Sequence, residues 1–240
     1  MNKIETTSRF AGSGSRPTEA NRLYPSYVDL DPLLDVGRLK ALDGLLLDGV
    51  RRRIDEPRDL KFCTGPFVLN PTDARIPGPQ MVYLSRSTVP DNYYLLDRPE
   101  CWEPTEAATE FAPLMDFIAT LPFKATARML IIYDQAGRAV PAHRDHDDID
   151  LCHEFIWFRT NLDKPFYMLD PITNEKRYVR SHAAWFDTVN QFHGADGNGR
   201  LSISIRVDGI FDDDFRRRIP LSIENKAAAP ALWASEMVTQ

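Results

Sequence analysis

Apolar residues recur at helical spacing in two stretches of the first half of the chain. They repeat every three or four positions between residues 31 and 54, and again between residues 104 and 120. This period predicts amphipathic helices. Residues 60–98, between these stretches, contain short apolar and aromatic runs split by prolines, which we interpret as strands or extended loops. The pattern therefore predicts a helical front over residues 30–120.

From about residue 125 the pattern changes to short strand-like runs that are separated by turn residues. The runs read ARMLIIYD, DLCHEFIWFRTNL, KPFYMLD, KRYVRSHAAWFDTV and RLSISIRVDGIF, and the turns read DQAG, DPITNE and DGNG. Short strands at this spacing are typical of an antiparallel sandwich or barrel such as a jelly roll. The fold class that we predict is mainly β, with a helical N-terminal part followed by a jelly-roll or cupin-like core.

Polar or alanine-rich segments flank this pattern at both ends. Residues 1–24 are mostly small and polar, and residues 221–240 are rich in alanine. We therefore expect a flexible N-terminal tail and a C-terminal tail. No repeat and no linker divides the chain between them. Residues 25–220 are expected to form a single domain, which is an ordinary size for this fold class.

Composition narrows the class of protein. The formal net charge is −6 at pH 7, which argues against binding nucleic acid through a basic surface. The three cysteines are odd in number and form no CxxC pair, which favours reduced thiols over disulfides or a zinc ribbon. The N-terminus has no apolar leader, and no stretch is apolar for long enough to cross a membrane. These features predict a soluble, cytoplasmic protein that binds neither nucleic acid nor membrane.

All five histidines lie between positions 143 and 193, within the predicted β core. His143 and Asp145 are two positions apart, so on a strand their side chains would share a face and could bind one metal ion. His193 is the best candidate for a third ligand, because a barrel brings together strands that are distant in sequence. Two histidines and one carboxylate form the facial triad of non-haem Fe(II) oxygenases, although zinc or nickel would also fit.

The segment from Arg200 to Asp208 alternates polar and apolar residues over its whole length. As a strand it would place two arginines and two serines on one face and the apolar residues on the other. These four residues are Arg200, Ser202, Ser204 and Arg206. Arginines on the inner face of a barrel are costly unless an anion is bound there. A dicarboxylate co-substrate would supply that anion, since arginine binds a carboxylate through two parallel hydrogen bonds.

Together these residues resemble the 2-oxoglutarate/Fe(II)-dependent dioxygenase superfamily over residues 125–212, in particular its aspartyl/asparaginyl and prolyl hydroxylase-like branches. Those families carry HxD, then a distal histidine within a phrase like FD…H, then an arginine that opens the last barrel strand. The matching residues are His143 and Asp145, Phe186-Asp187 and His193, and Arg200-Leu201-Ser202. The resemblance implies a catalytic domain with a double-stranded β-helix core that binds Fe(II) and 2-oxoglutarate. It would use O₂ to hydroxylate a substrate, with release of succinate and CO₂.

The resemblance also implies which residues hold the co-substrate. Arg200 fits the start of the final strand, whereas Arg206 fits the family's spacing from the distal histidine. We favour Arg200, assisted by Ser202, and keep Arg206 as the alternative. Tyr133 and His153 stand at places that line the 2-oxoglutarate pocket in similar enzymes.

Two other classes of protein remain open. One is a cupin-like metal enzyme that does not use 2-oxoglutarate, and the other is a non-catalytic β-sandwich binding module whose histidines are surface polar groups. Asp145 stands where related halogenases carry a small residue, so the resemblance implies hydroxylation or desaturation. It leans towards an amino acid or a peptidyl residue as the substrate, with a small metabolite also open. Nothing in the sequence indicates an oligomeric state.

Overall fold

The computed structural model describes residues 27–55, 80–90, 95–145, 154–170, 173–188 and 191–218. The two predicted tails and His153 lie outside these described residues. No helix in this part of the chain combines the length and the apolar character that crossing a membrane requires.

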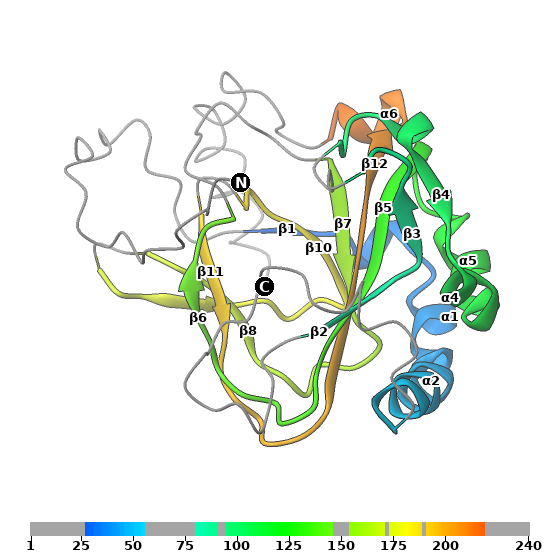
Figure 1. The fold of residues 1–240 in the computed structure, drawn as a ribbon. Helices are drawn as coiled ribbons and strands as arrows, with labels where there is room; N and C mark the ends of the chain where they lie inside the picture. The colour runs from blue at the N-terminus through cyan, green and yellow to red at the C-terminus, as the bar shows by residue number, and fades with distance from the viewer. Residues whose placement is uncertain are drawn as a thin grey trace, which may run out of the picture.

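The described residues form short helices and mostly short strands (Figure 1). The helices are η2 Asp31–Leu33, α1 Val36–Ala41, α2 Asp43–Asp55, η3 Pro99–Cys101, α4 Glu106–Glu110, α5 Ala112–Ile118 and α6 Asp213–Arg216. The first strands are β1 Val28–Asp29, β2 Gln80–Tyr83, β3 Ser85–Ser87 and β4 Trp102–Pro104. The remaining strands are β5 Phe123–Asp134, β6 Val140–His143, β7 Phe155–Phe158, β8 Phe166–Leu169, β9 Lys176–Tyr178, β10 Ala183–Trp185, β11 Phe192–Ala195 and β12 Ser202–Phe211.

Strands β5 to β12 wind alternately between two antiparallel sheets. The larger sheet has the order β1-β10-β7-β12-β5-β2, and the smaller sheet has the order β6-β11-β8-β9. If β5 to β12 are numbered as strands 1 to 8, the larger sheet holds strands 1, 8, 3 and 6 side by side in that order. The smaller sheet holds strands 2, 7, 4 and 5 in that order. This alternation is the winding of an eight-stranded jelly roll, so the predicted double-stranded β-helix core is confirmed.

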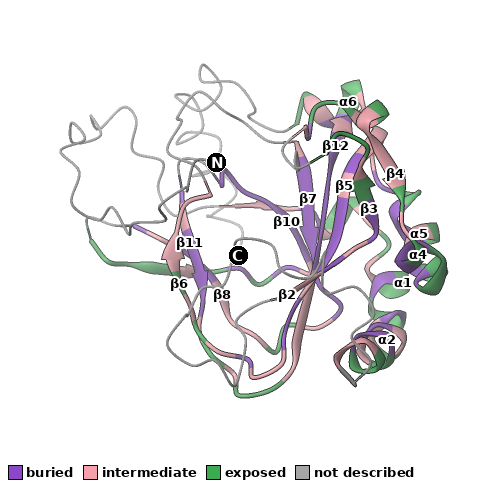
Figure 2. Cartoon of the chain, in the orientation of Figure 1, coloured by how far each residue is buried: buried purple, intermediate pink, exposed green. Residues whose placement is uncertain are grey.

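The larger sheet is covered on both faces. All four residues of β7 are buried, and Figure 2 shows β5, β7 and β10 as mostly buried strands. Phe155 and Trp157 of β7 face the space between the two sheets. Phe158 points to the opposite face, where its ring lies 5.5 Å from that of Phe117 on α5. Figure 1 shows α1, α2, α4 and α5 on that outer side. An inward and an outward apolar face explain why β7 is a continuous apolar run rather than an alternating one.

The predicted helical N-terminal part is confirmed, but each predicted helix is divided in two. The first stretch holds α1 and α2, and the second holds α4 and α5 with Phe111 between them. Pro113 lies in the first turn of α5. A proline is tolerated there because the backbone N–H that it lacks would have no helical partner, whereas it could not continue α4.

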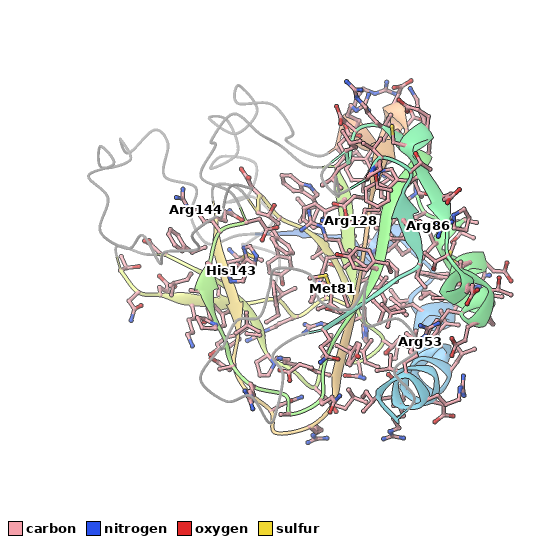
Figure 3. The ribbon with its side chains drawn as sticks, in the orientation of Figure 1. Arg53, Met81, Arg86, Arg128, His143 and Arg144 are labelled. Carbon is pink, nitrogen blue, oxygen red and sulfur yellow. The ribbon has the colours of Figure 1, made fainter. Side chains whose placement is uncertain are left out.

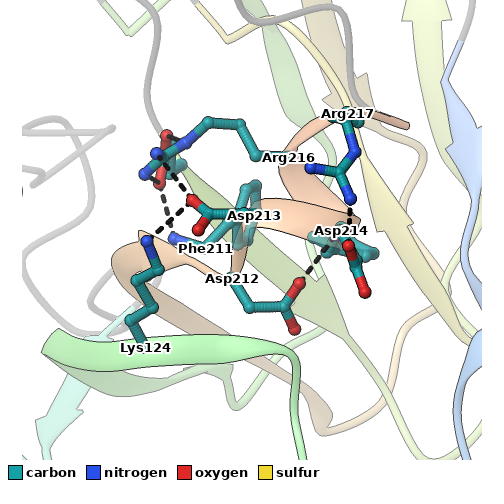
Figure 4. A network of polar contacts seen from close by, with 9 residues as sticks. Lys124, Phe211, Asp212, Asp213, Asp214, Arg216 and Arg217 are labelled. Carbon is teal, nitrogen blue, oxygen red and sulfur yellow. Dashed lines mark hydrogen bonds and ion pairs between the residues drawn. The ribbon is translucent and has the colours of Figure 1, made fainter.

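Helix α6 ties together strand ends that lead into the barrel (Figure 4). Lys124 on β5 donates to Asp213 on α6 at 2.7 Å. Glu154, directly before β7, accepts from Nε of Arg216 at 2.6 Å and from the backbone N–H of Phe211 at 2.6 Å. These contacts hold the ends of β5, β7 and β12 in a fixed relation.

Candidate metal centre

Three side chains, two from the neighbouring strands β6 and β11 and one from the segment that follows β6, converge between the sheets. His143 is the last residue of β6, and its Cα is paired with that of His193 on β11. One ligand atom each from His143, Asp145 and His193 lies within 4.8 Å of the other two. Oδ1 of Asp145 is 3.8 Å from Nε2 of His143 and 3.4 Å from Nε2 of His193. Metal–ligand bonds of about 2.1 Å would need only a small contraction of this arrangement.

The sequence predicted that His143 and Asp145 share a face of one strand, but the structure places Asp145 in a different way. Strand β6 ends at His143, so strand alternation does not place the carboxylate. Instead the backbone N–H of Asp145 donates to the carbonyl of Thr188 at 2.8 Å. A backbone hydrogen bond to the segment before β11 therefore fixes the residue beside both histidines.

Both imidazoles present the same nitrogen to the common centre. Nδ1 of His143 lies 2.8 Å from the carbonyl oxygen of Pro141, and Nδ1 of His193 lies 3.2 Å from that of Gln191. A carbonyl oxygen can only accept, so Nδ1 must carry the proton in each neutral ring. The lone pair is then on Nε2, which is the tautomer that a metal-binding histidine needs.

Charge and burial keep the site in its metal-binding form. Burial lowers the pKa of His143, and the neighbouring His193 lowers it further. Burial alone would raise the pKa of Asp145, but the close contact with His193 and the positive charge of Arg206 hold it well below the ordinary value of 3.8. At neutral pH the imidazole of His143 is therefore uncharged and Asp145 is ionised, and these are the forms that bind a metal.

The three side chains open into a cavity of about 210 Å³ between the two sheets. In Figure 3 the labelled Arg128 and Met81 of the larger sheet and His143 of the smaller sheet mark its opposite walls. Its apolar lining combines six aliphatic and five aromatic residues. The aromatic residues are Tyr133, Phe155, Trp157, Phe166 and Phe186. The rings of Phe186 and Phe166 lie 5.2 and 6.0 Å from that of His193, so the metal-facing imidazole stands in a low-dielectric wall.

The structure separates the two candidate arginines. Arg206 lines the cavity, and its Nη1 donates to Oδ2 of Asp145 at 2.8 Å. Arg200 precedes β12, has a side chain that is 70% exposed, and pairs with Asp163 at 3.2 Å. The prediction that Arg200 opens the final strand is wrong. The strand begins at Ser202, so Arg200 belongs to the preceding turn and does not share the inward face.

The other predicted co-substrate residues lie along the same cavity. Ser202 and Ser204 line it from β12. Tyr133 also lines it, while its hydroxyl donates to Oε1 of Gln80 at 2.6 Å. His153 is outside the described residues.

Several charged residues of the cavity were missed by the sequence reasoning. Lys164 and Asp134 form an ion pair of 3.0 Å in its wall, and both side chains are largely buried. Arg128 lines the cavity and donates to Asp208, which is fully buried. Asp208 could have been found, because it continues the alternation that sets the inward face of Arg206. Lys164 lies in a loop between strands, and no periodicity marks it.

Neither a protein-family model nor a curated protein matches the sequence. Solved structures with similar chains include a prolyl-4-hydroxylase from Pseudomonas putida, with 15% identity, a TM-score of 0.41, and coverage of 77% of this chain and 90% of that one. AviO1 from Streptomyces viridochromogenes has 14% identity, a TM-score of 0.47, and coverage of 77% and 89%. The non-haem alpha ketoglutarate-dependent epimerase SnoN has 13% identity, a TM-score of 0.39, and coverage of 77% of each chain. All three TM-scores are below 0.5, so the function must be argued from this chain's own residues.

Proposed function

We propose that this protein is an Fe(II)- and 2-oxoglutarate-dependent oxygenase that hydroxylates an amino acid, a peptidyl residue or a small metabolite. The observation that carries the proposal is the convergence of His143, Asp145 and His193 inside a jelly-roll cavity. Two imidazoles and one carboxylate on one side of a metal are the ligand set of non-haem Fe(II) oxygenases. The described residues supply three protein ligands to the site, and three ligands leave room for a co-substrate and O₂.

The donor set fits iron in its chemistry as well as in its number. His143 and His193 would hold the ion through Nε2, and Asp145 would hold it through Oδ1, since Oδ2 is engaged with Arg206. The bound iron would supply the activation of O₂. The protein's own contribution is to direct Nε2 of both imidazoles at the common centre and to place the rings of Phe166 and Phe186 beside His193, where they exclude water.

The cavity also fits a dicarboxylate such as 2-oxoglutarate. Nη2 of Arg206 is buried and has no hydrogen-bond partner among the described residues. A buried donor of this kind is unfavourable unless a ligand accepts from it. Arg206 would therefore bind the carboxylate near the metal. Ser202 and Ser204 would offer hydroxyls farther along the cavity.

A second cation lies towards the other end of the cavity. Ser202 is paired across the sheet with Asp134, whose carboxylate holds Lys164. Ser202 and Arg206 are four positions apart, which corresponds to about 13 Å of strand. Lys164 has further N–H groups beside the one directed at Asp134, so it would attract the far carboxylate. Two cations separated along one apolar cavity suit a molecule with a carboxylate at each end.

Anaerobic titration of the Fe(II)-loaded protein with 2-oxoglutarate tests the proposal. We expect a weak visible charge-transfer band that appears in the wild type and is lost in His193→Ala. His182→Ala is the matched control, because the Nδ1 of His182 contacts the carbonyl of Arg159 and the residue does not line the cavity. Release of succinate and CO₂ would then be measured with amino acids and peptides as substrates.

The outcomes distinguish a 2-oxoglutarate-dependent oxygenase from a cupin-like metal enzyme and from a non-catalytic binding module. Metal binding with no response to 2-oxoglutarate would indicate a cupin-like enzyme of another type. A purified chain that binds no Fe(II) would indicate a binding module and would refute the proposal.

A further inference from the structure

Four charged side chains of alternating sign run from the middle of the larger sheet to the candidate metal ligand. Nε of Arg128 donates to Oδ2 of Asp208 at 3.0 Å, and Nε of Arg206 donates to Oδ1 of the same carboxylate at 2.9 Å. Nη1 of Arg206 then donates to Oδ2 of Asp145 at 2.8 Å. We call this series the arginine–aspartate chain.

Its members are buried to an extent that is unusual for charged residues. The Asp208 side chain is fully buried, and those of Arg206 and Arg128 are 10% and 12% exposed. Buried charges destabilise a fold unless each is paired and hydrogen-bonded. Asp208 meets this condition because each of its oxygens accepts from a different arginine. The two positive and two negative charges also balance.

The fold contains a local irregularity at the centre of this chain. The pairing between β12 and β5 shifts register between Val207 and Gly209, so that Asp208 stands opposite two residues of β5, Ala127 and Arg128, as in a β-bulge of β5. A bulge changes the direction in which a strand residue points, and bulges often lie next to active sites. Here Asp208 lies between Arg206 of its own strand and Arg128 of the neighbouring strand β5.

The guanidinium of Arg206 has little freedom in this position. It is a planar group whose donors form a rigid fork. Nε is held by Asp208, and the guanidinium carbon lies 4.2 Å from the centroid of the Phe155 ring. Because Asp208 holds the Nε edge of the guanidinium and the Phe155 ring covers one of its faces, the direction of Nη1 towards Asp145 is fixed as well. Oδ2 of Asp145 is thereby occupied, and only Oδ1 faces the two imidazoles.

We propose that Arg128, Asp208 and Arg206 are positioning residues that hold Asp145 as a one-oxygen metal ligand. The inference rests on the proposed function, because it assumes that a metal binds at the three ligands. Arg128 and Asp208 do not contact Asp145, and they act on it through Arg206. Without them the carboxylate could rotate and bind the metal through both oxygens, which would fill a position needed by the co-substrate or O₂.

Co(II) is a suitable probe because its visible spectrum depends on the number and arrangement of its ligands. Calorimetric titration of the metal-free full-length protein with Co(II) would give the affinity, and absorption of the complex would report the geometry. We expect Asp208→Asn to weaken Co(II) binding by up to about 10-fold, which is the lower end of the effect of removing a direct partner of a metal ligand, because Asp208 acts on Asp145 through Arg206. We also expect its Co(II) spectrum to differ from that of the wild type.

Arg128→Gln is a second variant, at the far end of the chain of charges, in case Asp208→Asn does not fold. It should change the Co(II) spectrum in the same direction with a smaller loss of affinity. Asp163→Asn is the control, since it breaks the exposed ion pair with Arg200 and should leave both measurements unchanged. A role confined to stability would lower the urea midpoint of the variants but leave the Co(II) spectrum as it is.

The two proposals fail in different ways. If folded Asp208→Asn and Arg128→Gln give the wild-type Co(II) spectrum, the positioning role is overturned while the metal site stands. If the wild type itself binds no Co(II) and no Fe(II), the proposed function is overturned.

Discussion

His143 and His193 face each other as directly paired residues on β6 and β11, with ring centroids 4.5 Å apart. Each also donates its Nδ1 proton to the carbonyl of the residue two positions earlier. The two imidazoles are therefore oriented by hydrogen bonds to the backbone. We expect the site to be preformed in the metal-free protein, and the following predictions depend on this arrangement.

Asp145→Ala should abolish iron retention. The substitution removes one of three ligands, so the loss should exceed the roughly 10- to 100-fold effect that is typical for residues behind a ligand. Metal analysis after anaerobic loading and desalting measures it. Asp163→Ala, which removes an exposed carboxylate of the same charge, should retain iron like the wild type. Equal iron content in the two variants would exclude Asp145 as a ligand.

Arg206→Gln should weaken 2-oxoglutarate binding far more than Arg200→Gln. A hydrogen bond to a charged group contributes about 1.5–3 kcal/mol, so the loss at Arg206 should be roughly tenfold or more. Arg200 is exposed and outside the cavity, and its loss should change the affinity less than about twofold, in line with exposed ion pairs. Anaerobic titration of the Fe(II) protein gives both affinities. The reverse order would restore Arg200 as the co-substrate residue.

Gly194→Ala should destabilise the protein and weaken metal binding. A Cβ at this position would lie 2.7 Å from both Oη of Tyr167 and the carbonyl oxygen of Val140. The second contact is with the backbone of β6, so relief would require the pairing of β6 with β11 to open. Overpacking of this kind costs about 1–3 kcal/mol of unfolding free energy.

Gly44→Ala should change the free energy of unfolding in the opposite direction from Gly194→Ala. Gly44 is the second residue of α2, and a Cβ there would meet nothing within 4 Å. Replacing glycine by alanine where the backbone conformation suits both residues restricts the unfolded chain and stabilises a protein by roughly 0.4–1 kcal/mol, so this variant should be more stable. Urea unfolding compares the two variants. Wild-type stability of Gly194→Ala would show that the two strands can separate without cost.

The ionisation of Tyr178 should depend on Asp196. The carboxylate accepts from the hydroxyl of Tyr178 at 2.7 Å and from Nζ of Lys176 at 2.6 Å. The first hydrogen bond raises the pKa of Tyr178 above 10.0, since it stabilises the protonated phenol. A raised pKa in the folded state means that the contribution to stability is present below the ordinary pKa and is lost as the pH rises through the raised value.

Asp196→Asn should therefore move the Tyr178 titration to lower pH. Absorbance titration in the ultraviolet, with Tyr178→Phe to assign the residue, measures the shift. An unchanged titration curve would mean that the hydrogen bond does not form in solution.

The local pattern of apolar and polar residues was sufficient to predict a helix or strand where that pattern repeats over many residues. The apolar stripe before residue 55 predicted helices, and Leu39 and Leu46 are fully buried as it requires. The alternating segment before Asp208 predicted β12 and the inward direction of Ser202, Ser204 and Arg206. By contrast, β6 and β11 have four residues each, and these short segments show no clear period.

By itself, then, the sequence determined that a β core follows a helical part, and that two histidines and an aspartate are suited to one metal. These properties depend on the type and spacing of residues, which are local. The tertiary structure alone decided which arginine meets Asp145, that Lys164 reaches the cavity, and that Asp208 lies between two arginines. Those relations depend on where β12 begins, where its register shifts and which strands flank it, and these are set by packing between segments far apart in the chain.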